Sequence, residues 1–239
     1  KAREIFTDVR RFTNALVCGI HVHIGSQIET GDPFVEAFGK ILEFIGELEQ
    51  GGIKIKFLNL GGGLGAIYGD ENPQTAEEFA RKILPLFKKR KFQLIFEPGR
   101  FIAANSGILA TRVIYVKDTD VKKFAIVDAG MNDFIRPAFY NAFHNIWPVV
   151  QKENAKLWIY DVVGPICESG DFFAKDRELA EIRSQDLVAI MSTGAYGFTM
   201  ASNYNSRPRA CEVMVRGGAF KIVRKRETYQ DLIHGERAV

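Results

Sequence analysis

Three apolar segments, each followed by glycine or polar residues and then by an amphipathic pattern, constrain the fold of this chain most strongly. Segments 17–24, 53–60 and 92–96 are predicted strands, and they recur about every 36 residues with helical patterns between them. This repeat is typical of parallel βα units, in which each helix crosses over one face of a sheet. The first hundred residues are therefore expected to form an α/β unit.

The sequence also marks the ends of the two intervening helices. The first is predicted to begin at Asp32, with Pro33 in its first turn, and to stop at Gly51. The second is predicted to begin at a capping box formed by Thr75 and Glu78, because these two side chains can satisfy the exposed N–H groups of a first turn.

The pattern changes near residue 107. Strand-like segments then follow one another, and the last two are joined by a Gly-Gly pair that predicts a hairpin turn. A domain boundary is therefore predicted, with an α/β domain over 1–107 and a β-sandwich or β-barrel domain over 108–239. The predicted strands of the second domain are 108–116, 123–127, 156–163, 186–191, 211–216 and 219–224.

Three βα units are too few to close a (β/α)8 barrel, since eight units take roughly 200 to 250 residues. The chain begins with Lys1 instead of methionine, and residues 1–16 already show helical periodicity. We therefore expect 1–107 to be the last units of a TIM-like barrel and the sequence to be part of a longer protein.

Charge and cysteine usage narrow the class of protein. The formal net charge is only +3, and the short basic runs at 88–91 and 224–226 are typical of solvated faces, so nucleic-acid binding is not expected. No apolar run reaches the roughly 18 to 20 residues that a membrane span needs. The cysteines are odd in number and widely spaced, which indicates reduced thiols and a cytoplasmic protein: Cys18, Cys167 and Cys211.

Residues suited to a binding site follow each of the three parallel strands. His23 and Ser26 lie at the end of the first strand, a triple glycine follows the second, and Glu97 and Arg100 follow the third. Ligands of βα folds bind at the carboxyl ends of the strands. We therefore expect these residues to contribute to one site.

The triple glycine has two interpretations besides a flexible loop. Gly61, Gly62 and Gly63 remove every β-carbon from the turn, so backbone N–H groups can converge on an anion such as a phosphate. A dinucleotide turn of the form G-x-G-x-x-A also matches. It is disfavoured, because a loop follows in place of a helix and the acid Glu97 lies 36 positions after Gly61.

Two histidines and an acid leave structural alternatives open. His21 and His23 alternate on one strand face, but no H-x-x-x-H or C-x-x-C partner accompanies them, so no metal site is expected. A stacked or hydrogen-bonded imidazole is favoured. Glu97 is placed to deliver an acid to a barrel mouth, and an ion pair with Arg100 is its structural alternative.

The β-rich half carries further candidates. A glycine-containing loop combines the thiol of Cys167 with the carboxylate of Glu168, and Tyr196 lies in a loop after another predicted strand. Arg136 and Tyr140 are four positions apart, the helical spacing that lets both face one ligand. Taken singly, each of these residues is more often structural than functional.

Six segments together, in their order and spacing, resemble the diaminopimelate decarboxylase family of barrel-type enzymes that depend on pyridoxal phosphate. The segments are HVHIGSQ, LNLGGGLG, EPGR, DAGMNDFIRPAFY, GPICESGD and GAYGFTMASNYN. The resemblance implies decarboxylation of meso-2,6-diaminopimelate to L-lysine and CO₂ in lysine biosynthesis, with pyridoxal 5'-phosphate as cofactor. It also implies a homodimer in which the loop with Cys167 and Glu168 reaches into the partner's site.

The resemblance implies a role for each matching residue. His23 would stack on the cofactor ring, Ser26 and the amides of Gly61–Gly63 would bind its phosphate, and Glu97 would keep the pyridine nitrogen protonated. Cys167 would protonate the α-carbon. The remaining residues would contact the substrate. Glu168 would bind the distal ammonium, and Tyr196 would contact both the substrate and the cofactor. Three side chains would bind substrate carboxylate: Arg100, Arg136 and Tyr140.

The family's Schiff-base lysine lies well upstream of HVHIGSQ and has no counterpart in this sequence, which leaves the activity of the isolated chain open. Two alternatives remain: an ornithine or arginine decarboxylase of the same fold, and a non-catalytic pyridoxal-phosphate-binding protein without the lysine. Arg136 together with Glu168 favours diaminopimelate, because its far end carries an anion and a cation whereas ornithine presents only an ammonium.

Overall fold

The computed structural model describes residues 1–11, 13–88 and 90–237. Residue 12 of the predicted N-terminal helical pattern and residue 89 of the first basic run lie outside the described residues. The chain divides into two compact units, Lys1–Ala103 and Ala104–Val239. Among the described residues, no helix combines the length and apolar character required to cross a membrane.

The first unit contains a parallel sheet of three strands in the order β1 (Gly19–His21), β2 (Phe57–Asn59) and β3 (Gln93–Ile95). The predicted parallel βα units are therefore confirmed. The strands are shorter than the apolar segments that predict them, because only three residues of each are paired in the ladder. Their central residues lie side by side in register: Ile20, Leu58 and Leu94.

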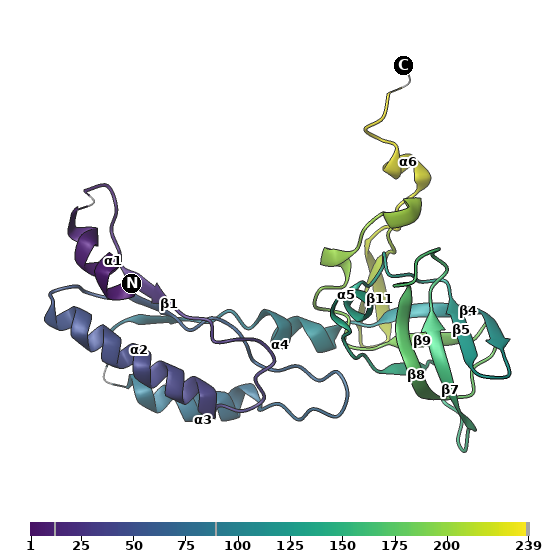
Figure 1. The fold of residues 1–239 in the computed structure, drawn as a ribbon, viewed down its shortest axis with the longest axis horizontal. Coiled ribbons are helices and arrows are strands. Elements are labelled where there is room, and N and C mark those ends of the chain that lie inside the picture. The colour runs from purple at the N-terminus through teal and green to yellow at the C-terminus, as the bar shows by residue number, and fades with distance from the viewer. Residues whose placement is uncertain (12, 89, 238–239) are drawn as a thin grey trace. The chain divides into compact units, whose positions relative to one another are not determined.

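Helices α2 (Asp32–Gln50) and α3 (Ala76–Phe87) lie side by side against one face of this sheet (Figure 1). The predicted capping box is confirmed: the Glu78 N–H donates to Thr75 Oγ1 at 3.2 Å, and the Thr75 N–H donates to the Glu78 carboxylate at 2.8 Å. The buried faces of helices and sheet share one core, whose most buried members include Phe34, Phe38, Ile45, Leu58 and Ile83.

Shorter helical elements flank this core. The predicted N-terminal pattern forms α1 (Ala2–Asp8) and the 3₁₀ turn η1 (Val9–Arg11). Directly after β3, the chain forms α4 (Gly99–Ala103), and the second unit begins with η2 (Ala104–Ser106). The strand end that carries Glu97 is therefore followed at once by a helical turn.

The second unit contains a six-stranded sheet in the order β6-β9-β4-β5-β7-β8. Neighbouring strands are antiparallel except β5 and β7, and the outer strands β6 and β8 approach each other, so the sheet is nearly closed into a barrel. The predicted α/β plus β-rich fold class is confirmed. The strands are β4 (Leu109–Asp118), β5 (Lys123–Val127), β6 (Ile146–Pro148), β7 (Leu157–Val163), β8 (Phe172–Ala180) and β9 (Leu187–Ile190).

A separate antiparallel ribbon follows, formed by β10 (Glu212–Arg216) and β11 (Ala219–Arg224). The predicted Gly-Gly hairpin turn is confirmed, with Gly217 at a φ of +58°. The remaining short elements of this unit are α5 (Arg136–Tyr140), η3 (Phe198–Met200), η4 (Tyr204–Ser206) and α6 (Tyr229–Leu232).

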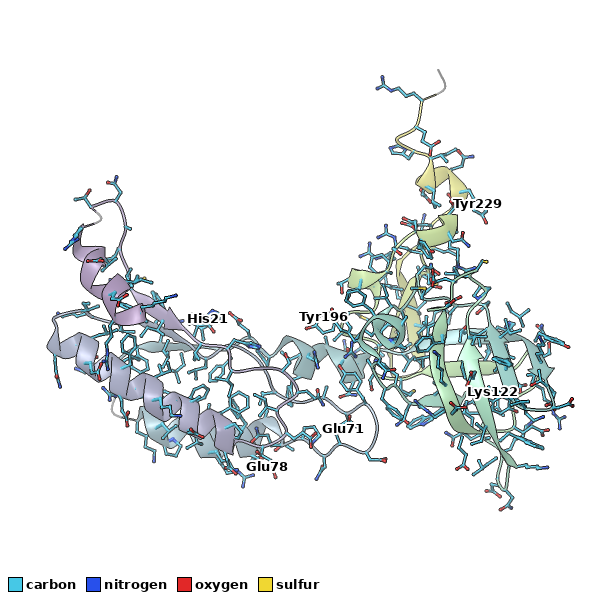
Figure 2. All side chains as sticks on the ribbon, in the orientation of Figure 1. His21, Glu71, Glu78, Lys122, Tyr196 and Tyr229 are labelled. Carbon is cyan, nitrogen blue, oxygen red and sulfur yellow. The ribbon has the colours of Figure 1, made fainter. Side chains whose placement is uncertain are left out.

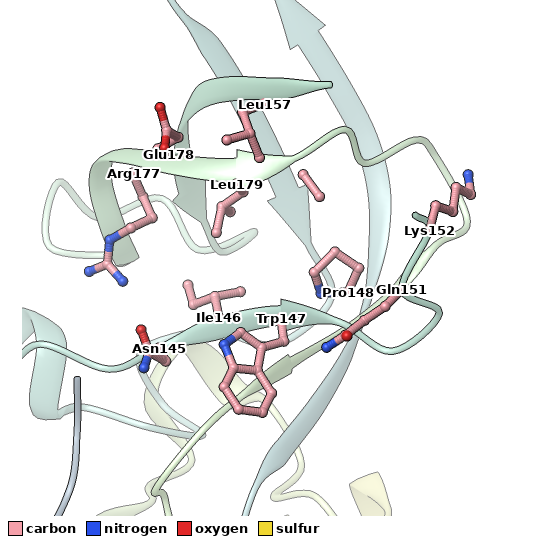
Figure 3. Close-up of a pocket in the computed structure, with 11 residues that line it drawn as sticks. Asn145, Ile146, Trp147, Pro148, Gln151, Lys152, Leu157, Arg177, Glu178 and Leu179 are labelled. Atoms are coloured by element: carbon pink, nitrogen blue, oxygen red, sulfur yellow. The ribbon is translucent and has the colours of Figure 1, made fainter. Parts of the chain in front are cut away.

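A cleft of about 310 Å³ opens between β6 and the β7–β8 pair (Figure 3). Ile146 and Trp147 lie on one side of it, and Arg177 and Leu179 lie on the other. It is lined by none of the residues that the sequence predicts for the site. The cleft therefore lies where the outer strands β6 and β8 of the sheet face each other.

Candidate functional site

The glycine turn Gly61–Gly63 at the end of β2 lies in close contact with the segments that follow β1 and β3. A β-carbon at any of its three positions would lie 2.3 to 2.5 Å from a backbone oxygen, closer than side chains approach. The backbone can therefore close up only because all three residues are glycine. The contacts are Gly61 with Val22, Gly62 with Glu97, and Gly63 with Gly25.

Two of the three glycine N–H groups donate within the protein. The Gly62 N–H donates to His23 Nδ1 at 3.3 Å, and the Gly61 N–H donates to Asn59 Oδ1 at 2.9 Å. The binding of one anion by all three N–H groups stays a prediction. The hydrogen bonds of Gly61 and Gly62 fix neighbouring side chains, and the ring of His23 is held beside the turn while it stays exposed.

Glu97 lies at the same edge of the sheet, and its half-exposed carboxylate is oriented by two residues. Asn59 Nδ2 donates to Glu97 Oε1 at 2.6 Å, and His21 Nε2 lies 3.6 Å from Glu97 Oε2. His21, labelled in Figure 2, pairs with Asn59 in the register of β1 and β2. The hydrogen-bonded imidazole favoured for these histidines is thus observed in His23 with Gly62, and His21 faces a carboxylate.

Ser26 is held near the glycine turn by the backbone. It is exposed in the loop after β1, and the Ile28 N–H of that loop donates to the Gly63 carbonyl oxygen at 2.9 Å. Arg100 lies in the first turn of α4, three positions after Glu97. The expected residues of the first unit therefore gather at the carboxyl edge of its sheet.

In the second unit, the structure brings Arg136 and Tyr196 together. Arg136 begins α5 and is only 6% exposed, and its guanidinium carbon lies 5.8 Å from the centroid of the Tyr196 ring. Arg136 Nη1 also lies 2.9 Å from Nε2 of the buried His144. The helical spacing predicted for Arg136 and Tyr140 is confirmed, with Tyr140 exposed and its ring packed edge-on against Phe139.

A buried carboxylate shapes the loop that carries Cys167 and Glu168. Asp171 accepts the N–H groups of Met131 and Ile166, each at 2.6 Å. Burial raises the pKa of Asp171, and the two backbone hydrogen bonds oppose that shift only in part. Cys167 and Glu168 are both exposed on this loop.

The Glu168 carboxylate is oriented from two sides. The Gly170 N–H donates to its Oε1 at 3.2 Å, and the Tyr204 hydroxyl donates to its Oε2 at 3.4 Å. The thiol and the carboxylate of this loop are thus presented together to solvent.

Four residues that shape the site have no role in the sequence-based analysis. One of them, Asn59, ends β2 two positions before the triple glycine, and a polar residue at the end of a strand is a usable signal for it. Asn59 and two others lie within the quoted motifs without an assigned role, and His144 lies outside all six motifs. The four are Asn59, His144, Asp171 and Tyr204.

The fold and these side chains define a βα-type ligand site joined to a nearly closed β-sheet unit. The family model described as "Pyridoxal-dependent decarboxylase, C-terminal sheet domain" matches residues 17–194. The chain belongs to this family of pyridoxal-dependent decarboxylases.

Relatives and solved structures agree with this membership. The chain is 47% identical over 234 residues to a diaminopimelate decarboxylase from Aquifex aeolicus, covering 98% of this chain and 56% of that protein. A crystal structure from Aquifex aeolicus has a TM-score of 0.96 at 45% identity, covering 100% of this chain and 59% of that one.

A second solved structure, diaminopimelate decarboxylase from Helicobacter pylori complexed with L-lysine, has a TM-score of 0.89 at 40% identity. The match covers 98% of this chain and 58% of that chain. This chain therefore spans little more than half the length of the relatives it matches.

Proposed function

We propose that the protein containing this chain decarboxylates meso-2,6-diaminopimelate to L-lysine and CO₂ with pyridoxal 5'-phosphate as cofactor. The observation that carries the proposal is the gathering of His23, the glycine turn and Glu97 at the carboxyl edge of one parallel sheet. The high identity to proteins named diaminopimelate decarboxylase supports the choice of substrate.

The residues at this edge fit the cofactor. When bound, pyridoxal phosphate supplies an electron sink for the carbanion left by departing CO₂. His23 offers an exposed imidazole to the ring, and Ser26 with the amides of Gly61–Gly63 would bind the phosphate. Glu97, oriented by Asn59 and His21, would hold the proton at the pyridine nitrogen.

The substrate-binding residues of both units follow from their chemistry. Arg136 is buried against the Tyr196 ring, an environment in which a guanidinium binds a carboxylate strongly. We assign it to the distal carboxylate, and Glu168 to the distal ammonium. Cys167 would deliver a proton to the α-carbon. Further contacts to carboxylate and to the cofactor are assigned to Arg100, Tyr140 and Tyr196.

We further infer a cytoplasmic homodimer in which two chains share each site. The Cys167–Glu168 loop exposes both functional side chains, and an isologous interface would present the same loop to each partner. All three cysteines are free of disulfides, which agrees with a reducing compartment.

The proposal is tested by assaying the full-length protein for CO₂ release from diaminopimelate, with ornithine as the rival substrate. Glu97→Gln, which keeps the shape of the side chain and removes its charge, should lower kcat by about a hundredfold or more. Glu153→Gln, a change at an exposed loop residue, is the matched control and should keep full activity. Release of CO₂ from ornithine but not from diaminopimelate would exclude the proposed substrate.

A further inference from the structure

We propose that His144 is a positioning residue that sets the direction of the Arg136 guanidinium and so determines the preference for a ligand with a distal carboxylate. This inference rests on the proposed function, in which Arg136 binds that carboxylate. It concerns contacts within the second unit alone.

His144 is completely buried and is held at both ring nitrogens. Its Nε2 lies 2.9 Å from Arg136 Nη1, and its Nδ1 lies 2.8 Å from the carbonyl oxygen of Met191. The ring also packs edge-on against Phe134, with centroids 4.7 Å apart. Every edge of the imidazole that could rotate away from Arg136 is thus constrained.

The partners assign the tautomer of this ring. A carbonyl oxygen only accepts hydrogen bonds, so His144 Nδ1 must carry the proton and donate to Met191. A guanidinium only donates, so Nε2 must be the acceptor of the Arg136 N–H. His144 therefore acts as a neutral acceptor for a buried cation.

This hydrogen bond links Arg136 to the sheet. Met191 directly follows β9, and its N–H donates to the Asn145 carbonyl oxygen at 2.8 Å, so His144 is fixed to the strand end from both sides. Helix α5, which carries Arg136, has only five residues. The imidazole therefore supplies rigidity that so short a helix does not provide.

The geometry of a guanidinium explains the consequence for binding. Its N–H groups form a planar fork, so fixing Nη1 sets the plane in which the other donors of Arg136 lie. The centroid of the Tyr196 ring lies 5.8 Å from the guanidinium carbon, so the ring also borders this group. A carboxylate then meets a preorganised partner, which lowers the cost of binding in an ordered geometry.

Two substitutions separate the two hydrogen bonds of His144. In His144→Gln, the side-chain amide reaches the place of Nε2 and can accept from Arg136. In His144→Asn, the shorter amide reaches only the place of Nδ1 and can donate to the Met191 carbonyl oxygen. A merely structural role predicts the same effect of both changes at equal loss of stability.

The experiment compares L-lysine, which retains the distal carboxylate of the substrate, with cadaverine, which lacks it. Dissociation constants of both ligands are measured by calorimetry on the full-length holoenzyme and its variants, together with the thermal unfolding midpoint. His144→Asn should reduce the preference for L-lysine over cadaverine by about tenfold or more, because it removes a hydrogen bond to a charged group. His144→Gln should keep the preference to within about threefold.

Loss of the preference in a folded His144→Gln protein would overturn the proposal, as would an unchanged preference in His144→Asn. If the asparagine variant does not fold, His144→Ala takes its place, because it also removes the acceptor for Arg136, and an unchanged preference in it would overturn the proposal. A wild-type protein that binds L-lysine and cadaverine equally would overturn the assignment of Arg136 to the distal carboxylate. Failure of the proposed function is thus distinguishable from failure of the role of His144, because it is seen in the wild-type protein.

Discussion

The carboxylate of Asp171 occupies the space that a side chain at Gly164 would need. A β-carbon at Gly164 would lie 2.4 Å from each carboxylate oxygen, and the Gly164 N–H donates to the Asp171 carbonyl oxygen at 3.0 Å. These two residues close the base of the loop that presents Cys167 and Glu168. The position of the thiol therefore depends on the packing of a glycine and a buried acid at the base of its loop.

Gly164→Ala should destabilise the protein by about 1 to 3 kcal/mol, because neither the backbone nor the hydrogen-bonded carboxylate can move away without cost. Urea unfolding of the full-length protein measures the change. Gly218→Ala is the matched control, since a β-carbon there meets nothing within 4 Å. Equal unfolding midpoints for the two variants would contradict the packing argument.

The ionised Glu227 carboxylate is expected to make the stability of the protein depend on pH. The Arg209 side chain and backbone N–H, with Asn203, hydrogen-bond its carboxylate and lower the pKa of Glu227 to about 2. Because the folded pKa lies below the unfolded value, Glu227 stabilises the protein fully above about pH 4.5, and this contribution is lost as the pH falls toward 2.

Glu227→Gln removes this titration. Unfolding free energies of wild type and variant, measured from pH 7 to pH 3, should differ most at neutral pH and converge on acidification. Glu153→Gln, at an exposed position before β7, serves as the control and should follow the wild type throughout. A difference independent of pH would show that the Glu227 charge does not contribute.

Arg136→Ala should cost about 2 to 4 kcal/mol in kcat/KM for diaminopimelate in the full-length enzyme, because a carboxylate loses its charged partner in a partly desolvated site. The loss should be much smaller for a substrate without the distal carboxylate. Arg183→Ala, which removes an exposed arginine paired with Glu181, is the control. Equal losses on both substrates would make Arg136 structural.

The shared site is tested by mixing two full-length variants, Glu97→Ala and Cys167→Ala, each of which is expected to be nearly inactive alone. If each site takes Glu97 from one chain and Cys167 from the other, a mixed dimer contains one intact site and one doubly altered site. Half the dimers are mixed after random exchange, so about a quarter of wild-type activity should return. Labelled subunits show whether the chains have exchanged between dimers. If they have exchanged and activity does not return, Glu97 and Cys167 of each site come from the same chain.

The sequence predicts the elements whose signals are local. The capping box at Thr75 and the Gly217 turn depend on neighbours within a few positions, and both are found as expected. Strands β6 and β8 are missed for different reasons. β6 has only three residues. β8 (FFAKDRELA) carries four consecutive charged residues in its middle, most of them exposed, so apolar content is a poor guide to it.

The residues of the candidate site also differ in whether their signals are local. Motif residues such as His23 and Glu97 are found from strand ends and from resemblance, whereas the residues that orient them depend on contacts between distant segments. Asn59 meets Glu97 across 38 positions, and His144 meets Met191 across 47. Such contacts exist only once the sheet is formed, so no periodicity in the chain encodes them.

The close contacts of the glycine turn also limit how a protein of this kind can diversify. Each of Gly61, Gly62 and Gly63 faces a different backbone oxygen, so a substitution at any one of them requires a strand end to move, and no second substitution nearby restores the space. A single substitution in this turn is therefore expected to displace the backbone that supports the site. A change of ligand preference without loss of the fold is expected to come from the side chains around the turn, such as Arg136 and Glu168.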